Sequence, residues 1–156
     1  MLLLLVLSAL IQLCAAGYRP AVRRYELKSP KIKRPVRLAL ISDLHSCRYG
    51  RNQSRLIRLI EAQNADAVFL AGDIVDDKLP EYRAYALCRE LALKYPCFYV
   101  AGNHEFRTGR ADEIKLRLKG MGITVLQGGC ARVCVQGQQL LIFGLDDPEF
   151  GERAFQ

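Results

Sequence analysis

The chain has 156 residues, 51% of them hydrophobic and 25% charged, which is enough for one domain with a modest core. Its net charge of +7 is local: of the 23 basic and 16 acidic residues, eight basic and one acidic fall between residues 18 and 37, and 15 of each remain elsewhere. A domain that binds nucleic acid would spread its basic residues over one surface. The composition therefore indicates no nucleic-acid partner, and it carries no signal for an oligomeric state.

The first 17 residues form an apolar segment. This segment is short for a helix that spans a bilayer, which needs about 20 residues. Cys14-Ala15-Ala16 offers small residues of the kind found at a signal-peptide cleavage site. We therefore expect residues 1–17 to be either a signal peptide or an uncleaved membrane anchor.

A basic linker is expected to follow over residues 18–35. Each Lys or Arg near an anionic lipid surface contributes roughly 1 kcal/mol of attraction, so the linker suits lipid headgroups, although an ordinary solvated linker explains it equally well. The protein is accordingly expected to be associated with a membrane through its N-terminal segment or to be exported. At the cytoplasmic membrane we favour the outer side.

From residue 36 onward, short apolar runs alternate with amphipathic segments. Strands that alternate with helices argue for a mostly parallel sheet in an α/β fold. Asn52 is predicted to cap the first helix, and the apolar runs beyond Gly122, which have no helices between them, predict hairpins near the end of the sheet. The predicted strands are 36–42, 67–71, 98–101, 123–126, 131–135 and 140–143, and the predicted helices are 52–63, 80–94 and 111–119.

Polar clusters follow the first three predicted strands, at the point where each strand ends. They are Asp43-Leu44-His45, Gly72-Asp73 and Gly102-Asn103-His104-Glu105, and they contain both histidines of the chain. Because ligands bind beyond the carboxyl ends of the strands in open α/β sheets, we expect the clusters to converge. Asp43 and His45 are two residues apart in what reads as an extended segment, which would point both side chains to one side. The alternative is a set of ordinary loop caps, since Asp and Asn favour turns.

The donor atoms in these clusters suit a metal ion. Carboxylate, imidazole and amide groups bind hard or borderline divalent ions such as Mn, Fe, Zn or Mg, whereas soft metals call for thiolates. The sequence contains no Gly-x-Ser-x-Gly motif, no P-loop and no Gly-x-Gly-x-x-Gly motif. Acyl transfer, nucleoside-triphosphate chemistry and dinucleotide chemistry therefore have no support.

The ordered set D-x-H, G-D-x-x-D and G-N-H-E resembles the calcineurin-like metallophosphoesterases, in particular the bacterial members with an N-terminal hydrophobic segment. The resemblance runs from about Val36 to Asp147. It implies an α/β fold in which two β-sheets pack face to face between helical layers, within a metallophosphoesterase domain over residues 36–156. It also implies two divalent metal ions and a hydroxide held between them that attacks a phosphomonoester, a phosphodiester or a pyrophosphate. The hydrophobic segment makes a lipid-linked phosphate ester an attractive substrate.

The resemblance also implies a role for particular residues. Asp43 and His45 would hold the first metal. Asp73 would bridge the two metals, and Asn103 would bind the second one. His104 would not bind metal but would face the scissile phosphate as the catalytic acid or charge stabiliser.

The sequence departs from the family pattern in one respect. That pattern continues with an isolated histidine and a G-H-x-H segment that complete both metal sites, whereas no histidine follows His104 here. We therefore expect the chain to be the N-terminal portion of the enzyme with the C-terminal part missing. The alternative is a truncated, catalytically incomplete fragment that binds metal without turnover.

Five further polar positions near the motifs have open roles. Asp76 is expected either to orient a ligand and its loop or to cap a helix, and Glu105 to hydrogen-bond an imidazole. Asp146 follows another predicted strand, so it either approaches the site or forms an ordinary turn. Arg48 and Arg51 would either meet a phosphate group or lie on a solvated loop.

Overall fold

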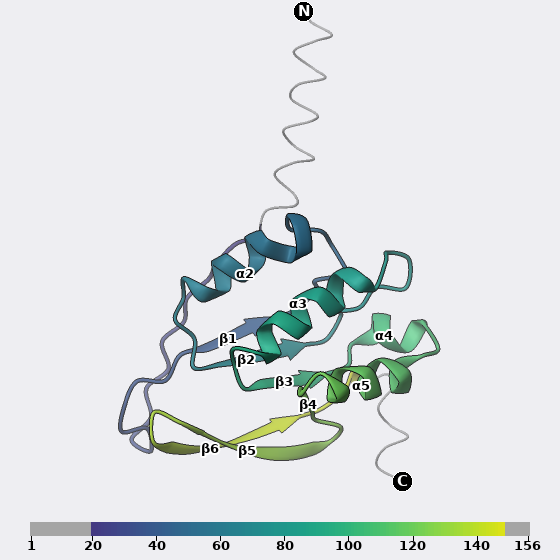
Figure 1. Ribbon diagram of the computed structural model, residues 1–156. Coiled ribbons are helices and arrows are strands. Elements are labelled where there is room, and N and C mark those ends of the chain that lie inside the picture. The colour runs from purple at the N-terminus through teal and green to yellow at the C-terminus, as the bar shows by residue number, and fades with distance from the viewer. Residues whose placement is uncertain (1–19, 149–156) are drawn as a thin grey trace, which may run out of the picture.

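Four parallel strands form the main sheet in the computed structural model, which describes residues 20–148 (Figure 1). The strand order is β1-β2-β3-β4, and in the register Leu38 lies opposite Ala67 and Val68 lies opposite Cys97. Parallel neighbours need crossover connections, which helices supply here. The strands are β1 (Leu38–Ile41), β2 (Ala67–Ala71), β3 (Cys97–Val100) and β4 (Thr124–Val125).

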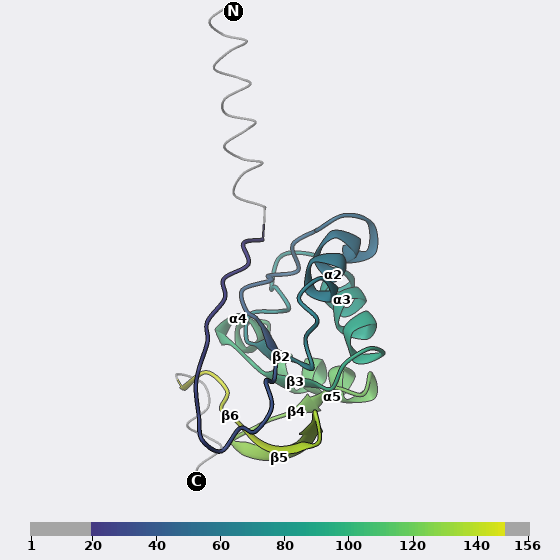
Figure 2. The ribbon, with the colours of Figure 1, turned by 90° about the vertical axis from the view of Figure 1, so that its left-hand side faces the viewer.

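Three helices pack on one face of this sheet (Figure 2). Alternate side chains of the strands, such as Val68, Leu70 and Tyr99, meet the apolar faces of the helices in one buried cluster. The mostly parallel α/β arrangement predicted from the alternation of apolar runs is therefore confirmed. The helices are α2 (Ser54–Glu61), α3 (Tyr82–Ala92) and α5 (Ala111–Gly120), with a short helix α4 (Asn103–Arg107) between β3 and α5.

The start of the first helix differs from the prediction. Asn52 does not cap α2 but lies with a φ of 47° inside the single turn η1 (Arg51–Gln53), and α2 begins at Ser54. The buried Gln53 side chain anchors this turn, since its amide oxygen accepts from the N–H of Tyr49 at 2.7 Å. An asparagine tolerates the left-handed backbone that the turn requires, so tertiary packing overrides its capping preference.

An antiparallel hairpin covers the other face of the sheet. Its strands are β5 (Gly129–Val135) and β6 (Gln138–Gly144), and the two residues between them have φ values of 50° and 71°, as a tight hairpin turn with right-handed strand twist requires. Side chains of the hairpin close a second apolar cluster around Phe98. The structure thus confirms a hairpin beyond Gly122, but places it in a second sheet and not in the main one, while the run before it joins the main sheet as the parallel strand β4.

The described part of the basic linker lies along the domain as an exposed segment without helix or strand (Figure 2). Arg24 donates to the side chain of Gln63, just beyond α2, at 3.0 Å, and the backbone N–H of Lys33 donates to Gln138 in the hairpin at 2.5 Å. The linker is therefore fastened to the domain at both places. The apolar segment predicted at residues 1–17 lies outside the described residues, and in residues 20–148 the helices are all too short or too polar to cross a membrane.

Candidate metal centre

The loops that follow β1 and β2 run side by side beyond the sheet. The backbone N–H of His45 donates to the carbonyl of Asp73 at 2.8 Å, and that of Ser46 donates to Ile74 at 3.1 Å. Asp43 and His45 nevertheless have φ values of 55° and 46°, so the predicted extended segment is wrong. Left-handed turns bring the two side chains together instead, with 3.8 Å between His45 Nε2 and Asp43 Oδ1.

The Glu105 carboxylate holds the loop after β2 against the start of α4. It is fully buried and accepts backbone N–H groups from both segments. The prediction that Glu105 bonds an imidazole is wrong, because four main-chain donors occupy both carboxylate oxygens. The donors are Asp73 at 3.0 Å, Ile74 at 2.7 Å, Val75 at 2.9 Å and Gly102 at 2.9 Å.

Two glycines allow these segments to approach closely. Gly72 has a φ of 78°, and a Cβ atom built on it would lie 2.9 Å from the Cα of Gly102. A Cβ on Gly102 would in turn lie 2.6 Å from the backbone nitrogen of Asp73. Only residues without side chains fit at this crossing, so the motif glycines are explained by sterics.

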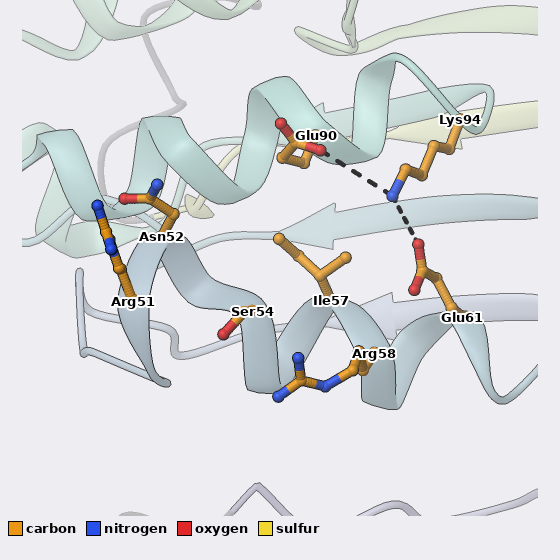
Figure 3. A pocket seen from close by; sticks show the side chains of 8 residues that line it. All are labelled: Arg51, Asn52, Ser54, Ile57, Arg58, Glu61, Glu90 and Lys94. Carbon is orange, nitrogen blue, oxygen red and sulfur yellow. Dashed lines mark hydrogen bonds and ion pairs between the residues drawn. The ribbon is translucent and has the colours of Figure 1, made fainter.

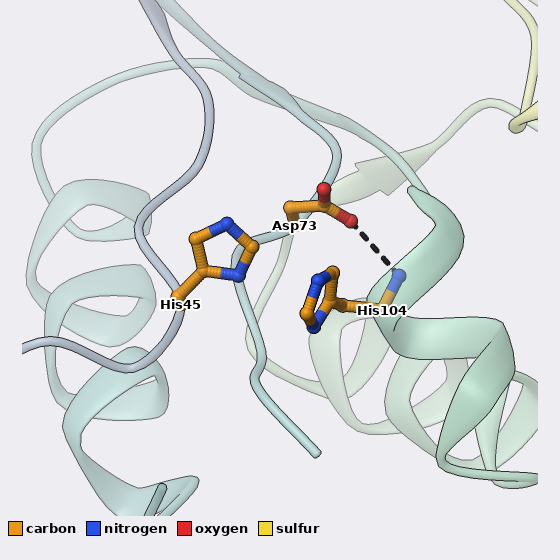
Figure 4. Close-up of side chains that lie close together, drawn as sticks. All are labelled: His45, Asp73 and His104. Carbon is orange, nitrogen blue, oxygen red and sulfur yellow. Dashed lines mark hydrogen bonds between the residues drawn. The ribbon is translucent and has the colours of Figure 1, made fainter. Parts of the chain in front are cut away.

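His45, Asp73 and His104 converge at the carboxyl ends of the strands (Figure 4). One ligand atom from each lies within 4.8 Å of the others, and the two imidazole rings are 4.4 Å apart, centre to centre. Asp73 Oδ1 also accepts the backbone N–H of His104 at 3.0 Å, which fixes the two residues relative to each other. The predicted convergence of the three clusters is therefore what the structure shows.

Several buried polar atoms at this site lack hydrogen-bond partners among the described residues. They are Nδ1 of His45, Nδ1 of His104 and Oδ1 of Asn103. Leaving such atoms unpaired costs about 1–3 kcal/mol each, so they call for a partner that accepts electron pairs. Together with the carboxylate of Asp73 they match the donor set that a divalent cation prefers, and the residues present fit a metal ion. The Asp43 side chain, 69% exposed, lies at the rim.

Asp76 orients its loop and faces the histidines, whereas the alternative role as a helix cap is wrong, because α3 has Glu81 at its N-cap position and no side-chain cap. Its Oδ1 accepts backbone N–H groups from Lys78 and Leu79 at 2.8 and 2.7 Å, which forms the loop before α3. Its Oδ2 lies 3.6 Å from His45 Nδ1 and 3.7 Å from His104 Nδ1. Burial alone would raise the pKa of Asp76, but the two hydrogen bonds and both imidazoles hold that pKa below its usual value. Asp76 is thus an anionic group beside both histidines.

Asp77 is a site residue that the sequence reasoning missed. Its Oδ1 lies 3.4 Å from His104 Nδ1, and Asp76, Asp77 and His104 form a second group of potential ligands. The only signal in the sequence was its position directly after Asp76, and acidic neighbours in a loop are too common to single it out.

Asp146 does not line the metal centre but supports the backbone next to it. Its Oδ1 accepts the backbone N–H of Ala101 at 2.8 Å, immediately before Gly102, and its Oδ2 pairs with Lys115 Nζ at 2.6 Å. The side chains of Lys115 and Asp146 are only 4% and 8% exposed. This buried pair joins α5 to the end of β3, so it supports the backbone that carries the Gly-Asn-His-Glu motif.

The two arginines named by the sequence, Arg48 and Arg51, are both exposed on the segment between β1 and α2. Arg51 borders an open hollow of about 440 Å³ between α2 and α3 (Figure 3). The hollow is lined by side chains of both charges and lies apart from the histidines, so it is no part of the metal centre.

A family model for calcineurin-like phosphoesterases matches residues 36–143. The chain therefore belongs to the calcineurin-like metallophosphoesterase family, as the ordered motifs and the α/β fold indicate.

The names of curated relatives agree with this family assignment. The chain is 33% identical over 118 residues to the Caenorhabditis elegans protein named "Putative metallophosphoesterase", covering 72% of this chain and 24% of that one. It is 25% identical over 113 residues to an uncharacterized metallophosphoesterase of Campylobacter jejuni, covering 69% and 29%. It is 26% identical over 157 residues to a zebrafish (Danio rerio) transmembrane protein with a metallophosphoesterase domain, covering 95% and 36%. The chain thus spans about a quarter to a third of the length of these relatives.

Proposed function

We propose that the protein is a metal-dependent phosphoesterase that hydrolyses a phosphomonoester, a phosphodiester or a pyrophosphate. The observation that carries this proposal is the pair of unpaired buried atoms His45 Nδ1 and Asn103 Oδ1 together with the Asp73 carboxylate, which lies within ligand distance of His45. Divalent ions bound there would supply electrostatic stabilisation of the phosphoryl group and would lower the pKa of water.

Membership of the family supports a role for each of these residues. Asp43 and His45 on the loop after β1 would hold one ion, Asn103 at the start of α4 would hold a second, and Asp73 between them would contact both. His104 is held by its backbone bond to Asp73, and its Nδ1 faces the Asp76 and Asp77 carboxylates. A proton on Nδ1 would face these carboxylates, which leaves Nε2 to meet a phosphate oxygen.

Replacing His104 by alanine tests the division between metal binding and catalysis. In the full-length protein, His104→Ala should lower kcat for an aryl phosphate diester by about 10²–10⁴-fold, as expected for an acid or charge stabiliser. Bound manganese, measured by elemental analysis, should not change. Loss of a whole metal equivalent would instead make His104 a ligand, in line with its place in the cluster with His45 and Asp73.

We also propose that the N-terminal segment attaches the protein to a membrane. The support is the apolar sequence of residues 1–17, the exposed basic linker after it, and the transmembrane proteins among the relatives. Cell fractionation should place the protein with membranes, and deletion of residues 1–16 should release it into the soluble fraction. In spheroplasts, protease should digest the domain if it faces outward, and a membrane-bound deletion variant would contradict the proposal.

A further inference from the structure

A small cavity bordered by the end of the loop that follows β1 is lined by three arginines. Arg48, Arg51 and Arg83 are among its eight lining residues, none of which is acidic. The cavity has a volume of about 160 Å³ and lies between the loop before α2 and the first turn of α3. We call it the arginine pocket.

A buried side chain joins the two segments that form the walls of the arginine pocket. Gln53 is 2% exposed, and its amide nitrogen donates to the carbonyls of Cys47 at 2.8 Å and Arg83 at 3.0 Å. These bonds join the loop that carries Arg48 to the helix that carries Arg83. The arginines are therefore held near one another by the fold and not by chance meeting of surface side chains.

Among residues 20–148, none of the three guanidinium groups forms an ion pair with a carboxylate. Nε of Arg83 is buried and has no hydrogen-bond partner among the described residues. In the larger hollow nearby, by contrast, Lys94 lies 2.6 Å from Glu61 and 4.0 Å from Glu90, so its charge is compensated (Figure 3). A buried, unpaired guanidinium donor carries a desolvation cost that an anionic ligand would offset.

The loop that follows β1 links the arginine pocket to the metal centre. Arg48 is three residues beyond His45 in the sequence. The carbonyl of Cys47, two residues beyond His45, accepts at 2.8 Å from the side chain of Gln53, which lines the pocket. The hydroxyl oxygen of Ser46, the residue before Cys47, accepts the backbone N–H of Asp76 at 3.1 Å, and Asp76 Oδ2 lies 3.6 Å from His45 Nδ1, so one loop borders both the pocket and the metal centre.

The size and the donors of the pocket define its ligand. Pockets for drug-sized ligands measure about 300–1,000 Å³, so a cavity of about 160 Å³ admits only a small group. Guanidinium forks bind phosphate oxygens through paired, charge-assisted hydrogen bonds. A phosphate group matches both conditions.

We propose that the arginine pocket binds a second phosphate group of the substrate while the scissile phosphate lies at the metal centre. This inference rests on the proposed function and narrows it to compounds that carry two phosphate groups, such as pyrophosphates and bisphosphates. Arg48 and Arg83 are then specificity-determining residues that touch the group that is not cleaved.

Binding without metal tests the pocket separately from hydrolysis. We would titrate the full chain, in the presence of a chelator, with methylenediphosphonate, a compound with two phosphonate groups that cannot be hydrolysed at its bridge. Calorimetry should show one site. Arg48→Ala and Arg83→Ala should each weaken binding at least tenfold, and Arg83→Lys should weaken it too because the charge remains but the fork is lost. Arg83 bonds Gln53 through its main chain, so its side chain can be changed without breaking that bond.

Arg89→Ala is the matched control. Arg89 is an exposed arginine on the same helix that does not line the pocket, so its removal changes the net charge equally. Absence of binding, or equal weakening by Arg89→Ala, would overturn the inference while leaving the metal-dependent hydrolysis of a monoester untouched. With metal present, Arg83→Ala should lower kcat/KM for a pyrophosphate substrate and leave that for a simple aryl phosphate unchanged; an equal loss for both would also overturn it.

Discussion

Gly102→Ala is expected to abolish metal binding and to destabilise the domain. A Cβ at this position would overlap the Asp73 carboxylate and would lie 2.6 Å from the Asp73 backbone nitrogen. The φ of Gly102 is −96°, a value that alanine can also adopt. The expected loss of stability and of metal binding therefore comes from the steric clash of the added methyl group. Forcing an extra methyl group into a packed site costs about 1–3 kcal/mol. The Asp73 side chain would have to leave its place between His45 and His104.

Two measurements check the Gly102 prediction. Thermal or urea unfolding should show the loss of stability, and equilibrium binding of Mn²⁺ should be lost or weakened by at least tenfold. Gly120→Ala is the matched control, because a Cβ there meets nothing within 4 Å and the residue ends a helix, where alanine is favoured. Unchanged manganese affinity in Gly102→Ala would show that Asp73 does not hold the ion.

Glu105→Gln should unfold the site although the substitution changes only one atom. Oε1 of Glu105 accepts from Ile74 and Val75, and Oε2 accepts from Asp73 and Gly102. Glutamine has a single acceptor oxygen, so its NH₂ group would face two backbone donors. Each buried donor left without a partner costs about 1–3 kcal/mol. Both loops that carry the motif residues would lose a common anchor.

The Glu105 prediction is tested by urea unfolding and by manganese binding in the same samples. We expect a loss of several kcal/mol in the free energy of unfolding, at about 1–3 kcal/mol for each orphaned donor, and a weaker affinity for the ion. Glu113→Gln is the control, since its side chain is 60% exposed on α5 and lies 3.9 Å from Arg110. A stability change within about 0.5 kcal/mol, as for an ordinary surface substitution, would contradict the anchoring role.

Features that depend on neighbours along the chain were predictable. The second strand was predicted as 67–71 and is Ala67–Ala71, because an apolar run between a turn and a glycine leaves little choice of boundary. The helix predicted at 111–119 is Ala111–Gly120. The convergence of His45, Asp73 and His104 was also predictable, since parallel strands deliver their carboxyl ends to one edge of the sheet.

Local backbone geometry at the site was not predictable. The extended conformation expected for Asp43 and His45 failed because both residues hydrogen-bond across to the loop after β2, and those bonds impose left-handed turns. Asn52 failed as a helix cap for a related reason, since the buried amide of Gln53 decides where the turn ends. Such bonds to distant segments outweigh the local preference of one residue.

The order of the motifs in the amino-acid sequence was sufficient to identify the family, the class of fold and the chemistry of the donor atoms, because each motif is a run of adjacent residues at the end of a strand. The role of Glu105, the support from Asp146 and the arginine pocket were decided by tertiary structure alone. Their partners lie 31, 45 and 30 residues away along the chain, in the pairs Glu105–Ile74, Asp146–Ala101 and Gln53–Arg83. No periodicity or spacing encodes such pairs, since only packing of the helices and loops against the sheet brings their atoms within hydrogen-bond distance.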